Sequence, residues 1–249
     1  MVDPVRLPVV EYPETDGNPM PDGDYQGDFY RYAVEAVRVH FLPRPEVYVT
    51  GDLFIYLEEG NPKNCIAPDM YVVMNGGHRF RDTYKVWEEP GGMPDFVLEI
   101  VSPSTWRTDL GPKRDRYAAL GVGEYWLHDP HANYMNPALA GFRLAGGIYE
   151  PIPGIESPDG TLTIHSETLG LDLRLQGEDL RFFDPVGGHD LLNRAEAQAE
   201  AYALMEKARA AEDNARKAQA QARAAEAQVR SAQDRINELE RALAKKRDS

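Results

Sequence analysis

The hydrophobic pattern is most informative between residues 94 and 130, where it predicts a strand, a helix and a second strand in turn. Residues 96–101 are almost all apolar and rich in β-branched side chains, which is typical of a strand buried on both faces. One charge, Glu99, interrupts this run. Because an ionised carboxylate in a buried strand is costly without a partner, we expect Glu99 to meet a cation, a metal ion or several hydrogen-bond donors.

The helix that follows supplies a candidate partner for Glu99. Four residues fall on one stripe at helical spacing: Leu110, Lys113, Tyr117 and Leu120. Three of them suit a face turned toward the sheet, which makes Lys113 the charged member of an inward face. We expect Thr108 or Asp109 to cap the start of this helix, and we assign Asp109 to the cap rather than to a site. Gly121 is expected to end the helix in a left-handed conformation.

Shorter patterns lie on both sides of this stretch. Residues 29–41 have helical periodicity, with Glu35 beside the apolar stripe, where a solvated position is its simplest interpretation. Strands are predicted over residues 46–57, with a bulge or kink at Gly51, and over residues 66–74. Further short strands are predicted over residues 141–145, 148–152, 161–164 and 171–175. Together these elements predict an α/β fold.

The C-terminal part of the chain has a different pattern, a seven-residue repeat without Pro or Gly. Position a of the repeat carries Ala201, Ala208, Ala215, Ala222, Val229, Ile236 and Leu243. Position d carries Ala197, Leu204, Ala211, Ala218, Ala225, Ala232 and Leu239. This coiled-coil signature predicts a helix of roughly 80 Å through which the chain forms a homo-oligomer, most firmly over residues 229–243. An Ala-rich single helix is the alternative interpretation.

Composition divides the chain into three parts. Residues 1–26 are rich in Pro, Gly and Asp and predict an extended arm, residues 27–188 form the predicted α/β domain, and residues 190–247 form the heptad-repeat helix. From Asp190 onward there are 12 basic and 11 acidic residues (+1), which leaves 15 basic and 30 acidic residues (−15) in the other 189. Such an acidic body argues against a general nucleic-acid coat protein, although carboxylates that bind divalent ions still permit a nuclease.

Other functional classes receive less support from the sequence. The single cysteine, Cys65, excludes an internal disulfide framework and fits a reducing compartment. No apolar run reaches membrane-spanning length, so we expect a cytoplasmic protein with no membrane partner. His128 and His131 lie close together but lack an evident third ligand, which favours a structural interpretation of both. Trp106 is expected to be a packing residue, with contact to a substrate as the alternative.

The acidic residues suggest metal-assisted hydrolysis of a phosphodiester. If the strands over residues 66–74 and 96–101 are antiparallel neighbours, Asp69 at the start of one lies near Glu99 at the end of the other. Asp95 then lies at the far end. Two such carboxylates suit one or two Mg²⁺ ions, and a nearby Lys113 could orient the attacking water or stabilise developing charge. The same spacing equally fits a structural ion pair between Glu99 and Lys113.

Four motifs in order resemble the Uma2 family of putative endonucleases, within the PD-(D/E)xK restriction-endonuclease-like superfamily. They are APD at residues 67–69, PDFVLEIVSPST at 94–105, DLGPKRDRY at 109–117 and GVGEYWLHDP at 121–130. The resemblance implies a mixed sheet flanked by helices, DNA as substrate, and Mg²⁺ as cofactor with Mn²⁺ as a possible substitute.

The resemblance also assigns roles to individual residues. Asp69 matches the first metal-binding aspartate, and Glu99 matches the acidic residue of the (D/E)xK half-motif. The chain departs from the superfamily pattern two residues after Glu99, where Val101 replaces the lysine, so Lys113 on the next helix would take that role. Secondary candidates are Asp95, Asp52 and Glu35. A nuclease-fold protein that does not cleave, and acts as a nucleic-acid-binding or assembly subunit, is the alternative function.

Overall fold

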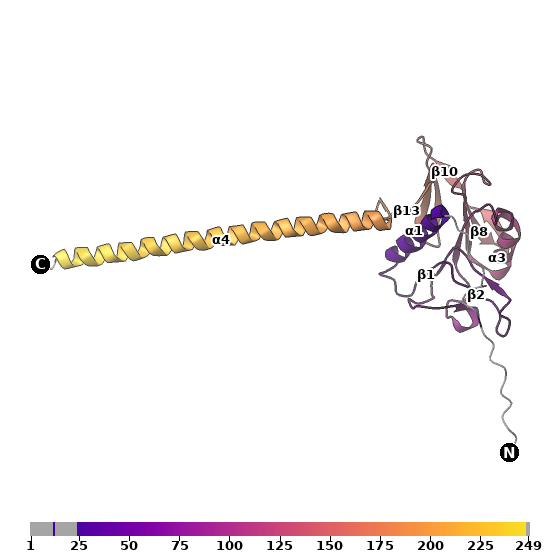
Figure 1. The fold of residues 1–249 in the computed structure, drawn as a ribbon, viewed down its shortest axis with the longest axis horizontal. Helices are drawn as coiled ribbons and strands as arrows, with labels where there is room; N and C mark the ends of the chain where they lie inside the picture. Colours follow the sequence, from indigo (N-terminus) through magenta and orange to yellow (C-terminus); the bar gives the residue numbers. More distant parts are fainter. Residues whose placement is uncertain (1–11, 13–23, 248–249) are drawn as a thin grey trace, which may run out of the picture. The chain divides into compact units, whose positions relative to one another are not determined.

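The structure is a computed structural model that describes residue 12 and residues 24–247. The chain divides into two compact units, Met1–Arg194 and Ala195–Ser249 (Figure 1). The arm predicted over residues 1–26 lies almost wholly outside the described residues. Its last three residues belong to helix α1 (Asp24–His40), which therefore begins earlier than the periodicity indicated.

A six-stranded mixed sheet forms the centre of the first unit, in the order β1-β4-β6-β7-β8-β9. Its strands are β1 (Tyr48–Thr50), β4 (Met70–Val73), β6 (Phe96–Ile100), β7 (Glu124–His128), β8 (Leu139–Ala145) and β9 (Ile148–Pro151). Strands β6 and β7 are parallel, and the other neighbouring pairs are antiparallel. A parallel pair needs a crossover connection, and the helical segment between β6 and β7 provides it.

Two smaller sheets complete this unit. A five-stranded sheet consists of β10 (Gly154–Glu156), β11 (Leu162–Ser166), β12 (Leu171–Gln176), β13 (Asp179–Asp184) and β14 (His189–Asp190). A three-stranded sheet consists of β3 (Cys65–Ile66), β2 (Ile55–Tyr56) and β5 (Tyr84–Lys85), which a short 3₁₀ helix, η1 (Val86–Glu88), follows. The predicted α/β class, with a mixed sheet flanked by helices, is confirmed.

The two faces of the central sheet pack into different hydrophobic clusters. Phe96, Leu98 and Ile100 of β6 face a cluster shared with α1 and the five-stranded sheet. Val97, the alternate residue on β6, faces a second cluster that contains Tyr117 of helix α3 (Arg114–Leu120). Because side chains alternate along a strand, Glu99 belongs to the face that packs with α3.

Two elements that the hydrophobic pattern predicts as continuous, one strand and one helix, are divided in the structure. The strand predicted over residues 46–57 divides after Thr50 into β1 and β2, which belong to different sheets. The helix after β6 begins at Trp106 as α2 (Trp106–Thr108) and continues as a π-helical turn, η2 (Asp109–Lys113), and then α3. It ends at Gly121, whose φ of 81° confirms the predicted left-handed C-cap.

The second unit is one long helix, α4 (Arg194–Arg247), which contains neither Pro nor Gly. Its composition of Ala, Glu, Gln, Lys and Arg gives high helix propensity over its whole length. Across the described part of the chain, no helix combines the length and apolar character that crossing a membrane requires.

Candidate active site

The candidate site begins with two carboxylates on neighbouring strands. Antiparallel pairing sets Met70 opposite Leu98, and the same register continued by one residue sets Asp69 opposite Glu99. The Ile100 N–H donates to Oδ2 of Asp69 at 2.6 Å, and the Asp69 N–H lies 3.4 Å from Oε2 of Glu99. Each carboxylate is therefore held by the backbone of the other strand.

Two side chains from the helical segment reach Glu99 from the other side. Nζ of Lys113 lies 2.8 Å from Oε2 of Glu99, and the Tyr117 hydroxyl donates to Oε1 at 2.7 Å. Lys113 and Tyr117 are four residues apart, so they share one helical face. Glu99 itself is 1% exposed. Both oxygens of this buried carboxylate thus have a charged or hydroxyl partner, which is what its burial requires.

Asp109 is a third carboxylate of the site, and its assignment as a helix cap is wrong. The helical segment already begins at Trp106, so Asp109 lies inside it, where it is 1% exposed. Its Oδ1 accepts a hydrogen bond from Nζ of Lys113 at 3.1 Å. The signal that could have identified Asp109 is its spacing, because residues four apart on a helix are neighbours and Lys113 was already expected to face inward.

Charge is unevenly balanced in this cluster. Burial and the neighbouring Glu99 raise the pKa of Asp69 well above its ordinary range, while Lys113 and the Ile100 N–H act in the opposite direction. Burial also raises the pKa of Glu99, against the lowering effect of Lys113. Burial alone would lower the pKa of Lys113, but the Glu99 and Asp109 carboxylates outweigh it and raise that pKa. A further cation beside Asp69 and Glu99 would favour their ionised forms, which burial disfavours.

Comparison with known proteins places the chain in a family. The Uma2 family, described as "Putative restriction endonuclease", matches residues 10–176. The chain belongs to the Uma2 family. Among solved structures it is similar to a putative nuclease belonging to DUF820 from Anabaena variabilis ATCC 29413, with 18% sequence identity and a TM-score of 0.43. That similarity covers 66% of this chain and 86% of the other. The search of curated proteins found no match to this chain.

The donors of this Uma2 chain suit a divalent ion of the magnesium type. Mg²⁺ is usually bound through one or two carboxylates, with waters and substrate phosphates completing its shell. Asp69 and Glu99 provide two such carboxylates, each held by the backbone of the other strand. Within the described residues, no group of three or more His, Cys, Asp or Glu side chains is arranged to hold a metal ion.

Of the secondary candidates, Asp95 and Glu35 lie away from Glu99 in the Uma2 fold, whereas the backbone of Asp52 lies beside Pro68, the residue before Asp69. Asp95 immediately precedes β6, at the opposite end from Glu99, and its Oδ2 accepts the Met74 N–H at 2.7 Å. Asp52 is exposed, with a φ of 54°, and its N–H donates to the Pro68 carbonyl at 3.1 Å. Glu35 is exposed on α1, the helix that packs with the sheet face opposite to the one bearing Glu99.

Of the remaining candidates, Trp106 and His128 take packing positions and His131 lies at the surface. The Trp106 ring stacks on Tyr134 with centroids 5.4 Å apart, and the Arg107 guanidinium lies 4.4 Å from the Trp106 centroid. His128 is fully buried on β7, where its Nε2 has no hydrogen-bond partner among the described residues. His131 is exposed, 3.8 Å from Glu178. Contact between Trp106 and a substrate stays a prediction.

Proposed function

We propose that this Uma2 chain is a Mg²⁺-dependent DNA endonuclease that hydrolyses phosphodiester bonds, with Mn²⁺ able to replace Mg²⁺. One observation carries the proposal: the carboxylates of Asp69 and Glu99 each accept a hydrogen bond from the backbone of the other strand, and the Lys113 ammonium group lies beside Glu99. Membership of the family described as "Putative restriction endonuclease" supports this function. We also propose that residues 27–188 form the catalytic domain and that the helix over residues 190–247 assembles a homo-oligomer.

Each residue of the site has a distinct role in this proposal. Asp69 and Glu99 would hold the metal ion. When bound, that ion polarises a phosphoryl oxygen and makes a bound water more acidic. Lys113 places a positive charge beside Glu99, where it can stabilise the negative charge that develops on the phosphoryl oxygens. Tyr117 is a positioning residue, because its hydroxyl fixes the orientation of the Glu99 carboxylate.

The rival is a protein of the same fold that binds or assembles without cleaving. One observation favours it: the contacts of Lys113 with Glu99 and Asp109 already neutralise much of the buried charge within the protein. Calorimetric titration with Mg²⁺ separates the two functions. The nuclease predicts binding that Asp69→Asn and Glu99→Gln each abolish, whereas the rival predicts no binding that depends on these two residues.

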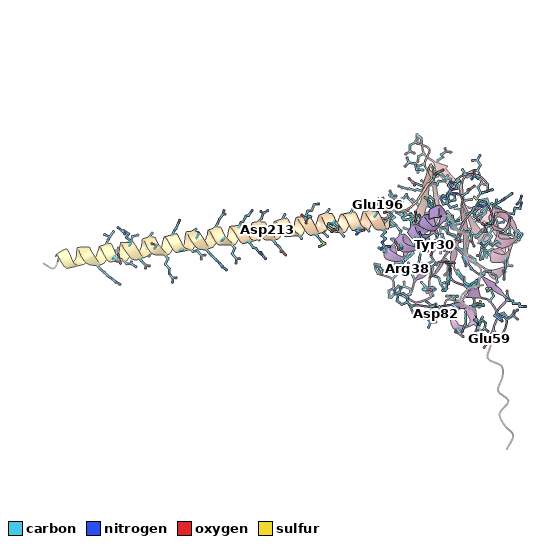
Figure 2. The ribbon with its side chains drawn as sticks, viewed as in Figure 1. Tyr30, Arg38, Glu59, Asp82, Glu196 and Asp213 are labelled. Atoms are coloured by element: carbon cyan, nitrogen blue, oxygen red, sulfur yellow. The ribbon has the colours of Figure 1, made fainter. Side chains whose placement is uncertain are left out.

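The direct test is nicking of supercoiled plasmid DNA with Mg²⁺ or Mn²⁺. Asp69→Asn, Glu99→Gln and Lys113→Met should each reduce the rate by roughly 100-fold or more, because each removes a charge in contact with the reaction. Asp82→Asn makes the same carboxylate-to-amide change at an exposed position and should cleave at the parental rate (Figure 2). Activity that survives in both Glu99→Gln and Lys113→Met refutes the proposed site.

A further inference from the structure

Helix α4 presents large apolar side chains at the seam of its heptad repeat. Val229 and Ile236 at position a are 70% and 48% exposed, and Leu204 and Leu239 at position d are 68% and 59% exposed. Figure 2 shows side chains extending from α4 along its length, among them Asp213 at the outward position f. An apolar stripe of this period on an otherwise charged helix is suited to a second helix of matching repeat.

The residues beside the seam carry charge of a different sign on each side. Position e holds Gln198, Met205, Glu212, Gln219, Glu226, Gln233 and Glu240. Position g holds Glu200, Lys207, Asn214, Gln221, Gln228, Arg235 and Ala242. Every charged e residue is therefore acidic, and two of the three charged g residues are basic. This asymmetry determines which orientation of two copies brings opposite charges together.

In a parallel, in-register pair, each g residue faces the e residue five positions later on the other helix. Lys207 then faces Glu212 of the second copy, and Arg235 faces Glu240 of the second copy. Twofold symmetry makes each pair occur twice. Each of the other pairs, formed by a g residue and the e residue five positions later on the second helix, includes at least one uncharged residue. The parallel arrangement therefore has attractive contacts and no like-charge contact between positions g and e.

An antiparallel pair brings g against g and e against e instead. If the two helices overlap along their full length, position a at residue 208 meets position d at residue 232. The same alignment sets Lys207 against Arg235 and Glu212 against Glu226 of the second copy. All of these contacts are between like charges, and such contacts disfavour the arrangement.

We propose that α4 pairs with α4 of a second copy of this chain as a parallel, in-register, two-stranded coiled coil. Charge complementarity selects the orientation, and the seam selects two strands, because Val229 and Ile236 at a with Leu239 at d is the combination that favours parallel dimers. The alanines elsewhere in the seam bury little surface, so the segment around residues 229–239 provides most of the attraction.

The parallel orientation has a consequence for catalysis. This consequence rests on the proposed nuclease function. Because α4 follows the globular unit in the chain, a parallel pair tethers both copies of that unit to the same end of the coiled coil. One dimer then carries two sites that can act on the two strands of one duplex. An antiparallel pair would tether them to opposite ends.

Disulfide trapping tests the orientation directly. In a Cys65→Ser background, Ala208→Cys and Ala232→Cys are made separately, one of them with a size tag, and are oxidised alone and as an equal mixture. The parallel pair predicts that each variant cross-links to itself and that no mixed dimer is trapped. Trapping of the mixed dimer alone shows an antiparallel pair and overturns the proposal.

Sedimentation equilibrium provides a second test that needs no cysteine variant. In the parallel pair, Lys207→Glu with Arg235→Glu turns every attractive contact into a repulsive one, so the dimer dissociation constant should rise roughly tenfold or more. Adding Glu212→Lys and Glu240→Lys should restore the parental value. An unchanged dissociation constant in the first variant, or a parental protein that is monomeric or trimeric, overturns the proposal. Neither test depends on nuclease activity, so a failure here is distinguishable from a failure of the nicking assay.

Discussion

Gly51 is the residue whose replacement should most directly connect packing to the candidate site. It follows β1, whose Thr50 pairs with Tyr71 of β4, so its backbone lies against the start of β4. A methyl group added at Gly51 would overlap the carbonyl oxygen of Asp69 and lie 2.9 Å from Cγ2 of Val34 on α1. Neither neighbour is the free end of a flexible side chain. Gly51→Ala must therefore move the backbone of residue 51 or of Asp69, and either movement changes how the two segments pack.

The size of the effect follows from the overlap. Non-bonded carbon and oxygen atoms stay about 3.5 Å apart, so relief of this contact requires a shift on the order of 1 Å. Overpacking of this kind costs about 1–3 kcal/mol in free energy of unfolding. A displacement of about 1 Å at a positioned catalytic group can cost roughly 100-fold in rate. We expect Gly51→Ala to lose both stability and nicking activity.

Urea unfolding and plasmid nicking measure the two effects separately. The matched control is Gly27→Ala on α1, where the added methyl group meets the flexible end of Arg31 at 3.0–3.2 Å. This control should nick DNA at the parental rate and gain up to about 1 kcal/mol, because alanine has the higher helix propensity. If Gly51→Ala unfolds and cleaves like the parent, the close approach of Gly51 to Asp69 does not position the site.

Three further variants test the buried cluster and a buried histidine. Lys113→Met should lower the free energy of unfolding by about 3 kcal/mol in urea titrations, since it leaves Glu99 buried without its cation. Tyr117→Phe should cost about 1.5–3 kcal/mol by the same measurement, because it removes a hydrogen bond to a charged group. Burial lowers the pKa of His128 from 6.5 to about 4, so between these pH values the unfolded chain binds a proton that the folded protein does not. Stability should therefore fall by up to about 3 kcal/mol as the pH falls from 6.5 to 4, and His128→Gln should lose that part of the pH dependence.

Much of this arrangement was accessible from the sequence because it rests on simple periodicity. A charge within the apolar run of β6 marked Glu99, and the stripe shared by Lys113 and Tyr117 predicted which helical face meets the sheet. Both side chains contact Glu99 in the structure. The helix of α4 was equally predictable, since its residues have high helix propensity over its whole length.

What could not be predicted depends on contacts between distant segments. Asp109 looked like a cap because helix capping is a local signal, whereas its burial results from packing of the helical segment on the sheet. Similarly, Gly51 predicted a bulge or kink within residues 46–57 but not their division between two sheets. The division comes at Gly51, where the chain passes close to Asp69 before it leaves the central sheet.

The position of Lys113 explains how the site can depart from the superfamily pattern and still place a cation beside Glu99. Val101, where that pattern has lysine, is 3% exposed and belongs to the same hydrophobic cluster as Tyr117. An ammonium group there would have to be buried among apolar side chains. The π-helical turn ending at Lys113 instead brings the ammonium group to 2.8 Å from Glu99 while its side chain keeps 26% exposure. The proposed hydrolysis would need a positive charge at that point in space, and a helix can supply it as well as a strand.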